Sequence, residues 1–165
     1  AIHPVGAVQS EYSLATRFPE LGLVQKTAEV GATLVAFSPL GRSLLTDDPH
    51  SPEKALTLPF LKNNPRFIEP NISRNVAASA GFRALAMDMG LAASSLAIAW
   101  VLHQGAHIVT IPGTRSTDHL KELAKGAEVR LSAADVQAID LHLPVGWAHG
   151  DRYSTEQWAG PEKYC

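Results

Sequence analysis

The chain has 165 residues, of which 45% are hydrophobic and 18% are charged, a balance that suits a single domain over residues 1–165 with a buried core. Its 14 Lys and Arg residues nearly balance its 16 Asp and Glu residues, which argues against the basic surface that nucleic-acid binding requires. The one cysteine, Cys165, excludes an intrachain disulfide and a zinc site built on several thiolates.

The first third of the chain alternates between strand-like and helix-like segments. Residues 5–9 and 33–37 are small, β-branched or apolar, which predicts two buried strands. The apolar spacing between them predicts a helix that starts near Pro19 and ends at Gly31. A strand, a helix and a second strand are therefore expected in that order.

Residues 38–70 differ in composition from the rest of the chain. They hold six of the 11 prolines together with the pair Asn63-Asn64, which predicts a long structured loop with one short helix. Loops of this length are uncommon in compact domains and are usually functional.

Two helices are predicted after this loop. The first is capped by Asn71 or Ser73 and runs to about residue 89. Its predicted buried positions are Val76, Ala80, Leu85 and Met89. The second starts at Ser94 or Ser95, is apolar on nearly every side, and ends at Gly105.

The last third of the chain predicts one more strand and two capped helices. Residues 107–111 form the strand, and Pro112-Gly113 ends it. Ser116 caps a helix through about residue 125, and Ser132 with Asp135 forms a capping box for a helix to about residue 143. Residues 144–165 are rich in Gly, Pro, Trp and Tyr and predict an ordered carboxyl-terminal loop.

Strands that alternate with helices indicate an α/β fold with parallel pairing. Three strands are few for such a sheet, and a complete (β/α)8 TIM barrel takes about 250 residues. The pattern therefore predicts part of a TIM barrel, with about three strand–helix units. We also expect exposed apolar residues along the strand edges unless another chain covers them.

Two of the segments that follow predicted strands combine a glycine with hydroxyl groups and an arginine. They are residues 38–42 and 112–116, and the second leads directly into a helix N-terminus. Active sites of parallel α/β folds lie at the carboxyl ends of the strands, and this combination suits a phosphate group. The alternative is two tight turns with solvated arginines.

Six stretches of the chain resemble the sequence motifs of a known family. The matching stretches, which cover most of the chain, are VQSEYSL (8–14), AFSPLGR (36–42), NPRF (64–67), LAIAWVL (96–102), IPGTRSTDHLKEL (111–123) and GDRY (150–153). In this order and spacing the chain resembles the carboxyl-terminal half of the aldo-keto reductases. The resemblance implies the last three or so units of a TIM barrel that reduces aldehydes and ketones with NADPH, without metal or flavin.

The resemblance also implies where the cofactor would lie. Gln9 would hydrogen-bond the nicotinamide carboxamide, and Phe37 would stack on the nicotinamide ring. The loop over the pyrophosphate would consist of Ser38, Pro39, Leu40, Gly41 and Arg42. The 2′-phosphate, ribose and adenine would be met by Gly113, Thr114, Arg115, Ser116, His119 and Glu122.

Three positions depart from the family pattern. Ser43 and Asp47 replace two glycines of the loop, which would make this loop stiffer or hold it differently. Leu123 replaces the asparagine that contacts adenine, and a leucine side chain makes no hydrogen bond.

No catalytic residue is assigned to this chain. The family's catalytic Asp, Tyr, Lys and His all belong to the amino-terminal half, and neither Tyr12 nor His119 replaces them by motif. A tyrosine with a pKa near 10 needs a cationic neighbour to act as an acid near pH 7. The seven histidines include no H-E-x-x-H motif, and we expect no metal site.

The carboxyl-terminal loop has two possible roles. In the family this region lines the substrate pocket, so Trp147, Arg152 and Tyr153 are candidates for contacts to a carbonyl substrate. The equal alternative is that the loop only packs across the barrel.

The sequence thus predicts the NADPH-binding half of an aldo-keto reductase. The alternatives are a non-catalytic NADP-binding or interaction module from a truncated gene, and one chain of a split enzyme. The expected partners are a carbonyl substrate and a polypeptide that covers the open strand edges. The longest apolar run, residues 96–102, is shorter than the ~20 residues of a membrane span, and no signal peptide is recognised, so a cytoplasmic protein is expected.

Overall fold

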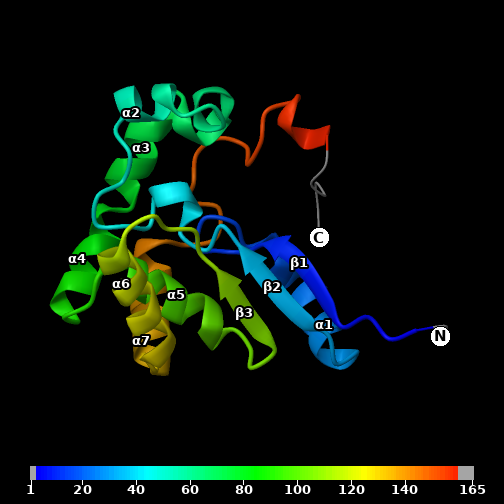
Figure 1. Cartoon of the computed structure of the whole chain (residues 1–165). Coiled ribbons are helices and arrows are strands. Elements are labelled where there is room, and N and C mark those ends of the chain that lie inside the picture. The colour runs from blue at the N-terminus through cyan, green and yellow to red at the C-terminus, as the bar shows by residue number, and fades with distance from the viewer. Residues whose placement is uncertain (1–2, 160–165) are drawn as a thin grey trace.

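The computed structural model describes residues 3–159, in which three parallel strands form one sheet (Figure 1). The strands are β1 (Ala7–Glu11), β2 (Thr33–Phe37) and β3 (Ile108–Ile111), in the spatial order β1-β2-β3. The predicted set of parallel neighbours is confirmed. The first strand lies two residues later than predicted, which leaves Gln9 inside the strand instead of at its end.

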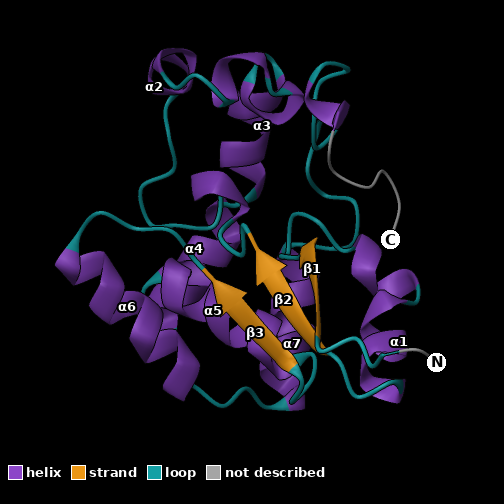
Figure 2. Cartoon of the chain, turned by 45° about the vertical axis from the view of Figure 1, so that its right-hand side comes forward, coloured by secondary structure: helices purple, strands orange, loops and turns teal. Residues whose placement is uncertain are grey.

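Helices cover one face of the sheet and leave the other face open (Figure 2). On the covered face, Leu34, Ala36 and Ile108 are buried beneath α1 (Leu23–Glu29) and α5 (Ala93–His103). On the open face, Val109 and Ile111 are 44% and 48% exposed. The expectation of exposed apolar residues along the strand edges is confirmed.

The central helix is α5, which is apolar all round because other elements surround it. Nine of its residues are buried, from Ala93 to Val101. The next helix, α6 (Thr117–Glu128), packs directly on it, and a side chain at Gly126 would come within 2.5 Å of the Ser95 carbonyl oxygen. The absence of a side chain at this glycine therefore permits the close approach of the two helices.

The predicted helix from residue 71 to about 89 is wrong in its continuity. It is divided at Ser79 into α3 (Asn71–Ala78) and α4 (Ala80–Asp88). The Ser79 hydroxyl donates to the Val76 carbonyl and accepts from Arg83, and such local bonds compete with the helical ladder.

Three of the four positions predicted to be buried do face the core. Val76, Leu85 and Met89 are half-buried and pack against it, whereas Ala80 is exposed. The positions that the structure buries are Ile72, Asn75, Phe82 and Ala86. The predicted cap of α3 is also wrong, because Pro70 occupies that position and Asn71 lies inside the helix.

Two other segments differ in detail from the prediction. The helix expected after Pro19 is a 3₁₀ turn, Phe18–Leu21, followed after Gly22 by α1. The loop 38–70 holds one α-helix, α2 (Pro52–Thr57), as predicted, but also short 3₁₀ turns at Gly41–Ser43, Leu61–Asn63 and Pro65–Phe67.

The last two helices begin where the sequence predicts. Ser116 caps α6 by accepting a hydrogen bond from the His119 backbone N–H. Ser132 and Asp135 form the predicted capping box of α7 (Ala133–His142). The carboxyl-terminal loop is described to residue 159 and ends in a 3₁₀ turn, Gln157–Ala159, so residues 160–165 of that predicted loop lie outside the described part.

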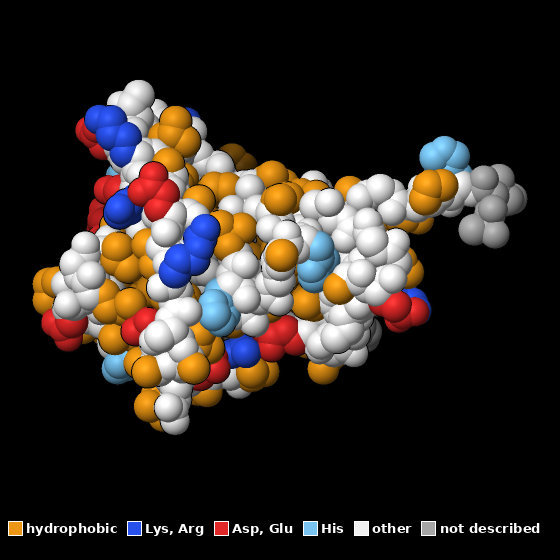
Figure 3. Space-filling view, turned by 90° about the horizontal axis from the view of Figure 1, so that it is seen from below, with side chains coloured by type: hydrophobic (Ala, Val, Ile, Leu, Met, Phe, Trp, Pro, Cys, Tyr) orange, Lys and Arg blue, Asp and Glu red, His pale blue; other side chains and the backbone are white. Residues whose placement is uncertain are grey.

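The surface seen from below mixes charges of both signs with apolar side chains (Figure 3). Across residues 3–159, no single helix is long and apolar enough to cross a membrane. One pair that is bent by 92°, Asn71–Asp88 with Ala93–His103, passes that test only when its members are taken together.

Candidate functional site

The carboxyl ends of the three strands lie at one edge of the sheet. The strands end at Glu11, Phe37 and Ile111, and their parallel order brings the segments that follow them side by side (Figure 2). The two segments predicted to bind phosphate, residues 38–42 and 112–116, therefore follow neighbouring strands. This edge is the candidate functional site.

Gln9 and Phe37 lie on the same face of the sheet. Gln9 pairs with Val35, and Glu11 pairs with Phe37, so the two predicted side chains are diagonal neighbours on adjacent strands. Gln9 is exposed and Phe37 is half-buried, both on the open face. An amide and an aromatic ring thus stand together where a flat heteroaromatic ring with its own amide could lie.

The segment before α6 has the features of an anion site. Thr114 and Arg115 are exposed, and the Thr114 hydroxyl oxygen accepts a hydrogen bond from the Ser116 backbone N–H at 3.2 Å. Ser116 caps the helix, whose N-terminal N–H groups and dipole favour negative charge. The exposed Gly113 adds no side chain that would obstruct a ligand.

The other residues of α6 that the sequence analysis singled out have different surroundings. His119 is exposed, whereas Glu122 is half-buried and accepts a hydrogen bond from the Ser94 hydroxyl on α5 at 3.2 Å. Leu123 is 5% exposed and belongs to the core between helices. The burial of Leu123 gives this departure from the family pattern a packing role.

The loop after β2 adopts an unusual backbone. Ser38, Arg42 and Ser43 have φ values of 50°, 55° and 92°, in the left-handed region that non-glycine residues rarely occupy. Gly41 has the same sign of φ at 55°. Pro39 is buried and Leu40 packs on the core, so part of this predicted cofactor loop serves to anchor it.

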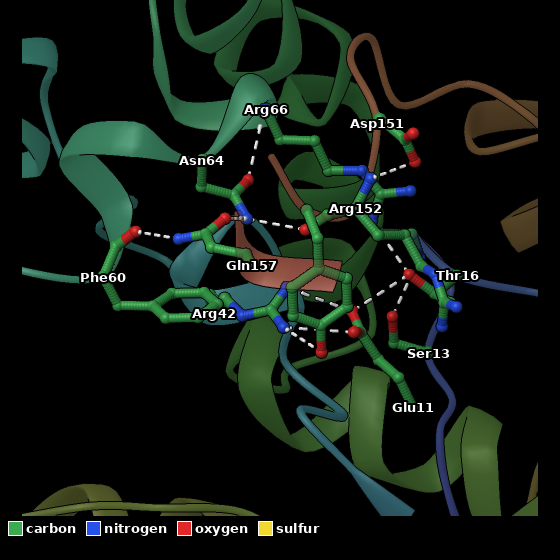
Figure 4. Close-up of polar contacts among 12 residues, drawn as sticks. Glu11, Ser13, Thr16, Arg42, Phe60, Asn64, Arg66, Asp151, Arg152 and Gln157 are labelled. Carbon is green, nitrogen blue, oxygen red and sulfur yellow. Dashed lines mark hydrogen bonds and ion pairs between the residues drawn. The ribbon is translucent and has the colours of Figure 1, made fainter. Parts of the chain in front are cut away.

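Arg42 is paired inside the protein (Figure 4). Its two terminal nitrogens donate to the two carboxylate oxygens of Glu11 at 3.1 and 3.0 Å, and one of them also donates to the Tyr153 hydroxyl at 2.9 Å. The ring centres of Phe60 and Tyr153 each lie 4.9 Å from its guanidinium carbon. Sequence reasoning expected this guanidinium to face a phosphate.

Glu11 is the centre of a buried polar cluster that the sequence analysis did not assign to the site. Its carboxylate is fully buried and also accepts from the Thr16 hydroxyl at 3.2 Å. Arg66 in turn donates to the Thr16 hydroxyl at 2.8 Å (Figure 4). The pKa of Arg66 is lowered to about 10, chiefly by burial. Glu11 opposes this shift, and the charges of Arg42 and Arg152 contribute to it.

Two asparagines, Asn64 and Asn75, fasten the carboxyl-terminal loop to the segment before and within α3. Asn64 donates to the Arg152 carbonyl oxygen at 2.6 Å. Asn75 donates to the His149 carbonyl oxygen and accepts from its N–H. Asn71 donates to the Pro65 carbonyl oxygen, directly beside Gly150. The NPRF and GDRY stretches, far apart in sequence, thus meet here, and this signal could have indicated the cluster.

The residues predicted for a substrate pocket lie in different surroundings. Trp147 is part of the core and donates through Nε1 to the Leu14 carbonyl oxygen. Arg152 is buried, with its guanidinium carbon 5.2 Å from the Trp158 ring centre. Tyr153 lines a hollow of about 730 Å³ between residues 63–71 and 151–158. Of these three, Tyr153 is the one that lines this hollow.

Neither phenol beside the site is suited to act as an acid. Tyr12 donates to Glu20 at 3.0 Å, and burial, assisted by that carboxylate, raises its pKa far above 10. Burial also raises the pKa of Tyr153, with a further contribution from Glu11 that Arg42 opposes. Within the described residues, no group of three or more His, Cys, Asp and Glu side chains is placed to hold a metal ion.

Comparison with known proteins gives consistent matches. A family model described as the aldo/keto reductase family matches residues 2–144. An aldo-keto reductase of Strobilurus tenacellus is 32% identical over 155 residues, which are 92% of this chain and 46% of that protein. A probable aldo-keto reductase of Glycine max is 37% identical over 153 residues, which are 93% of this chain and 44% of that protein. The chain spans about half the length of these curated relatives.

Solved structures show the same fold. A glycerol dehydrogenase of Gluconobacter oxydans gives a TM-score of 0.71 at 24% identity, over 86% of this chain and 43% of that chain. An aldo-keto reductase from Klebsiella pneumoniae, in complex with NADPH, gives 0.61 at 19% identity, over 84% and 39% of the two chains. These neighbours are TIM barrels, which confirms the prediction of part of such a barrel.

Proposed function

The chain belongs to the aldo/keto reductase family, and on that basis we propose that it supplies the cofactor-binding half of an NADPH-dependent oxidoreductase. The proposed reaction reduces an aldehyde or ketone by hydride transfer in the cytoplasm. NADPH supplies the hydride when it is bound. The residues of this chain bind and orient it, and the proton comes from residues outside the chain.

The observation that carries this proposal is the alignment of suitable groups along one sheet edge. Gln9 and Phe37 stand together on the open face. The exposed Thr114 and Arg115 and the half-buried Ser116 lie at the N-terminus of α6, after the strand next to β2. This arrangement fits a long ligand with a flat ring at one end and a phosphate at the other.

The open sheet face supports a proposal about a partner. Val109 and Ile111 are half exposed there, whereas parallel sheets are normally covered on both faces. We propose that a polypeptide equivalent to the amino-terminal half of the relatives covers this face, whether in one longer chain or as a separate chain. A non-catalytic nucleotide-binding module is the outcome expected if such a partner restores no activity.

The experiment is a titration of the chain with NADP⁺ and NAD⁺ by isothermal calorimetry. Arg115→Ala should weaken NADP⁺ binding about tenfold to a hundredfold and leave NAD⁺ binding nearly unchanged, because a charge-assisted bond to the 2′-phosphate is lost. Lys121→Ala is the matched control, since Lys121 is an exposed cation of α6 paired with Asp118. Equal losses for both nucleotides in Arg115→Ala would contradict the proposal.

A further inference from the structure

We propose that Glu11 is a positioning residue for the loop after β2 and that it acts through Arg42. The Arg42 side chain links β1, this loop and the carboxyl-terminal loop. The inference rests on the proposed function because that loop is expected to cover the bound nucleotide. It departs from the reading in which Arg42 binds a phosphate.

The guanidinium of Arg42 is already occupied by contacts within the protein, which disfavours its binding to a ligand. Both oxygens of Glu11 accept from its guanidinium, and the Tyr153 hydroxyl accepts a further bond. The Arg42 side chain is 14% exposed and that of Glu11 is 0% exposed. If Arg42 left for a phosphate, a buried carboxylate would lose its main partner, and breaking a buried ion pair in this way is strongly unfavourable.

The surrounding charges reinforce this pairing. Glu11 is the one carboxylate in the buried part of the described chain, and the guanidiniums of Arg66 and Arg152 are also buried. Arg66 reaches Glu11 through the Thr16 hydroxyl, and its pKa responds to the charges of both other arginines. Two carboxylates offset these like charges, Asp151 and the buried Glu11, and both raise the pKa of Arg66. Glu11 is the carboxylate whose oxygens accept from Arg42.

The pairing of Arg42 with Glu11 bears on the backbone conformation of the loop after β2. Arg42 has φ 55° and ψ 46°, and its neighbours Gly41 and Ser43 also have positive φ. Non-glycine residues stay in such conformations only when the surrounding structure imposes them. Glu11, which lies on a rigid strand, and Tyr153 both bind the Arg42 side chain, so these two residues impose the shape of the loop.

The test compares Glu11→Gln, Arg42→Gln and the double variant, titrated with NADP⁺ and with adenosine 2′-monophosphate. Each single change should weaken NADP⁺ binding about tenfold, and the double variant should be no weaker than either, because the pair acts as one unit. Adenosine 2′-monophosphate lacks the pyrophosphate and the nicotinamide half and should bind all variants equally. A phosphate-binding Arg42 would instead make Arg42→Gln weaker while Glu11→Gln binds normally or more tightly, and that result would overturn the proposal.

Limited trypsin digestion supplies a readout that needs no cofactor. Trypsin cleaves after arginine, so the bond between Arg42 and Ser43 should be protected in the parent chain and cut selectively in Glu11→Gln. Cleavage after Arg74, an exposed residue of α3, reports general unfolding and should not change. Tyr153→Phe, which keeps the ring but removes the hydroxyl, should give an intermediate rate. If the bond between Arg42 and Ser43 were equally protected in Glu11→Gln, the positioning role of Glu11 would be refuted.

The two readouts separate this inference from the proposed function. If the parent chain binds neither nucleotide, the proposed function fails in the isolated chain, and the trypsin comparison still decides whether Glu11 holds Arg42. If the parent chain binds both nucleotides and Glu11→Gln binds NADP⁺ equally well, the proposed function stands and the positioning role fails.

Discussion

At the scale of single residues, Gly150 shows how closely the carboxyl-terminal loop approaches the rest of the chain. Its φ is +88°, and a side chain there would meet the Pro65 carbonyl oxygen at 2.7 Å and the Asn71 amide nitrogen at 2.8 Å. Gly146 has a similar φ of +83° but nothing within 4 Å of the corresponding position. Substitution at Gly146 therefore reports the free-energy cost of the backbone conformation alone. Substitution at Gly150 adds the cost of a close contact.

We predict that Gly150→Ala destabilises the chain by at least about 1 kcal/mol more than Gly146→Ala. Both substitutions carry the cost of placing alanine at positive φ, roughly 1–2 kcal/mol, but only Gly150→Ala also forces apart two packed segments. Thermal unfolding followed by circular dichroism measures the difference, which corresponds to a few degrees in Tm. Equal shifts in Tm would show that the loop is not held tightly against Pro65.

At the scale of elements, α5 depends on a cap from a distant part of the chain. The sequence pattern predicts that Ser94 or Ser95 starts this helix, but the cap position is Ala92, whose side chain cannot accept a hydrogen bond. The carboxylate of Asp47 accepts from the Ala93 N–H instead, with both oxygens at 3.1 Å. Asp47 stands at a position where the family commonly has glycine, so this departure tethers the loop after β2 to the central helix.

We expect Asp47→Ala to lower the free energy of unfolding by about 0.5–2 kcal/mol, the usual cost of losing a helix cap. Asp48→Ala is the control, because Asp48 is the next residue along, carries the same charge and is also exposed. Urea titration of both variants checks this. A loss in Asp48→Ala as large as in Asp47→Ala would point to net charge and not to the cap.

The capping box of α7 gives an element whose stability depends on pH. The hydroxyl and backbone N–H of Ser132 donate to the Asp135 carboxylate at 2.7 and 2.8 Å, and these bonds lower the pKa of Asp135. A carboxyl whose folded-state pKa is lowered stabilises the fold above its unfolded pKa, near 4, and loses this contribution as the pH falls through the folded value.

The predicted result is that Asp135→Ala lowers Tm by a few degrees at pH 7 and that this difference shrinks towards pH 2. Ser132→Ala should keep part of its deficit at pH 2, because the Ser132 hydroxyl oxygen also accepts from the Asp135 backbone N–H at 3.2 Å, which does not titrate. Differential scanning calorimetry across this pH range makes the comparison. A constant deficit in Asp135→Ala would mean that the carboxylate is not the stabilising group.

At the scale of the whole molecule, the chain holds binding groups on an incomplete sheet. The strands and the segments after them bring together the Gln9 amide, the Phe37 ring and the segment before α6 that we propose to bind phosphate, whereas both tyrosines near this edge have raised pKa values. The open face exposes Val109 and Ile111. These features favour nucleotide binding over turnover in the isolated chain.

We predict that the isolated chain oxidises no NADPH in the presence of an aromatic aldehyde. A general acid is commonly worth 10²–10⁴-fold in rate, and an open sheet face orients reactants less well than an enclosed pocket does. Co-folding with the amino-terminal half of the Glycine max relative should restore turnover, measured by NADPH absorbance. Turnover by the isolated chain, after contaminating enzymes are excluded, would contradict the prediction. It would indicate that Tyr12 or Tyr153 is the general acid.

The amino-acid sequence by itself determined the parallel strands, the capped starts of α6 and α7, and the family, because these depend on local patterns of apolar spacing, caps and short motifs. Tertiary structure alone decided the Asp47 cap of α5 and the pairing of Arg42 with Glu11. Each of these joins polar groups that lie far apart in the sequence and that folding brings together. A buried charge must find a partner, and that partner can lie anywhere along the chain.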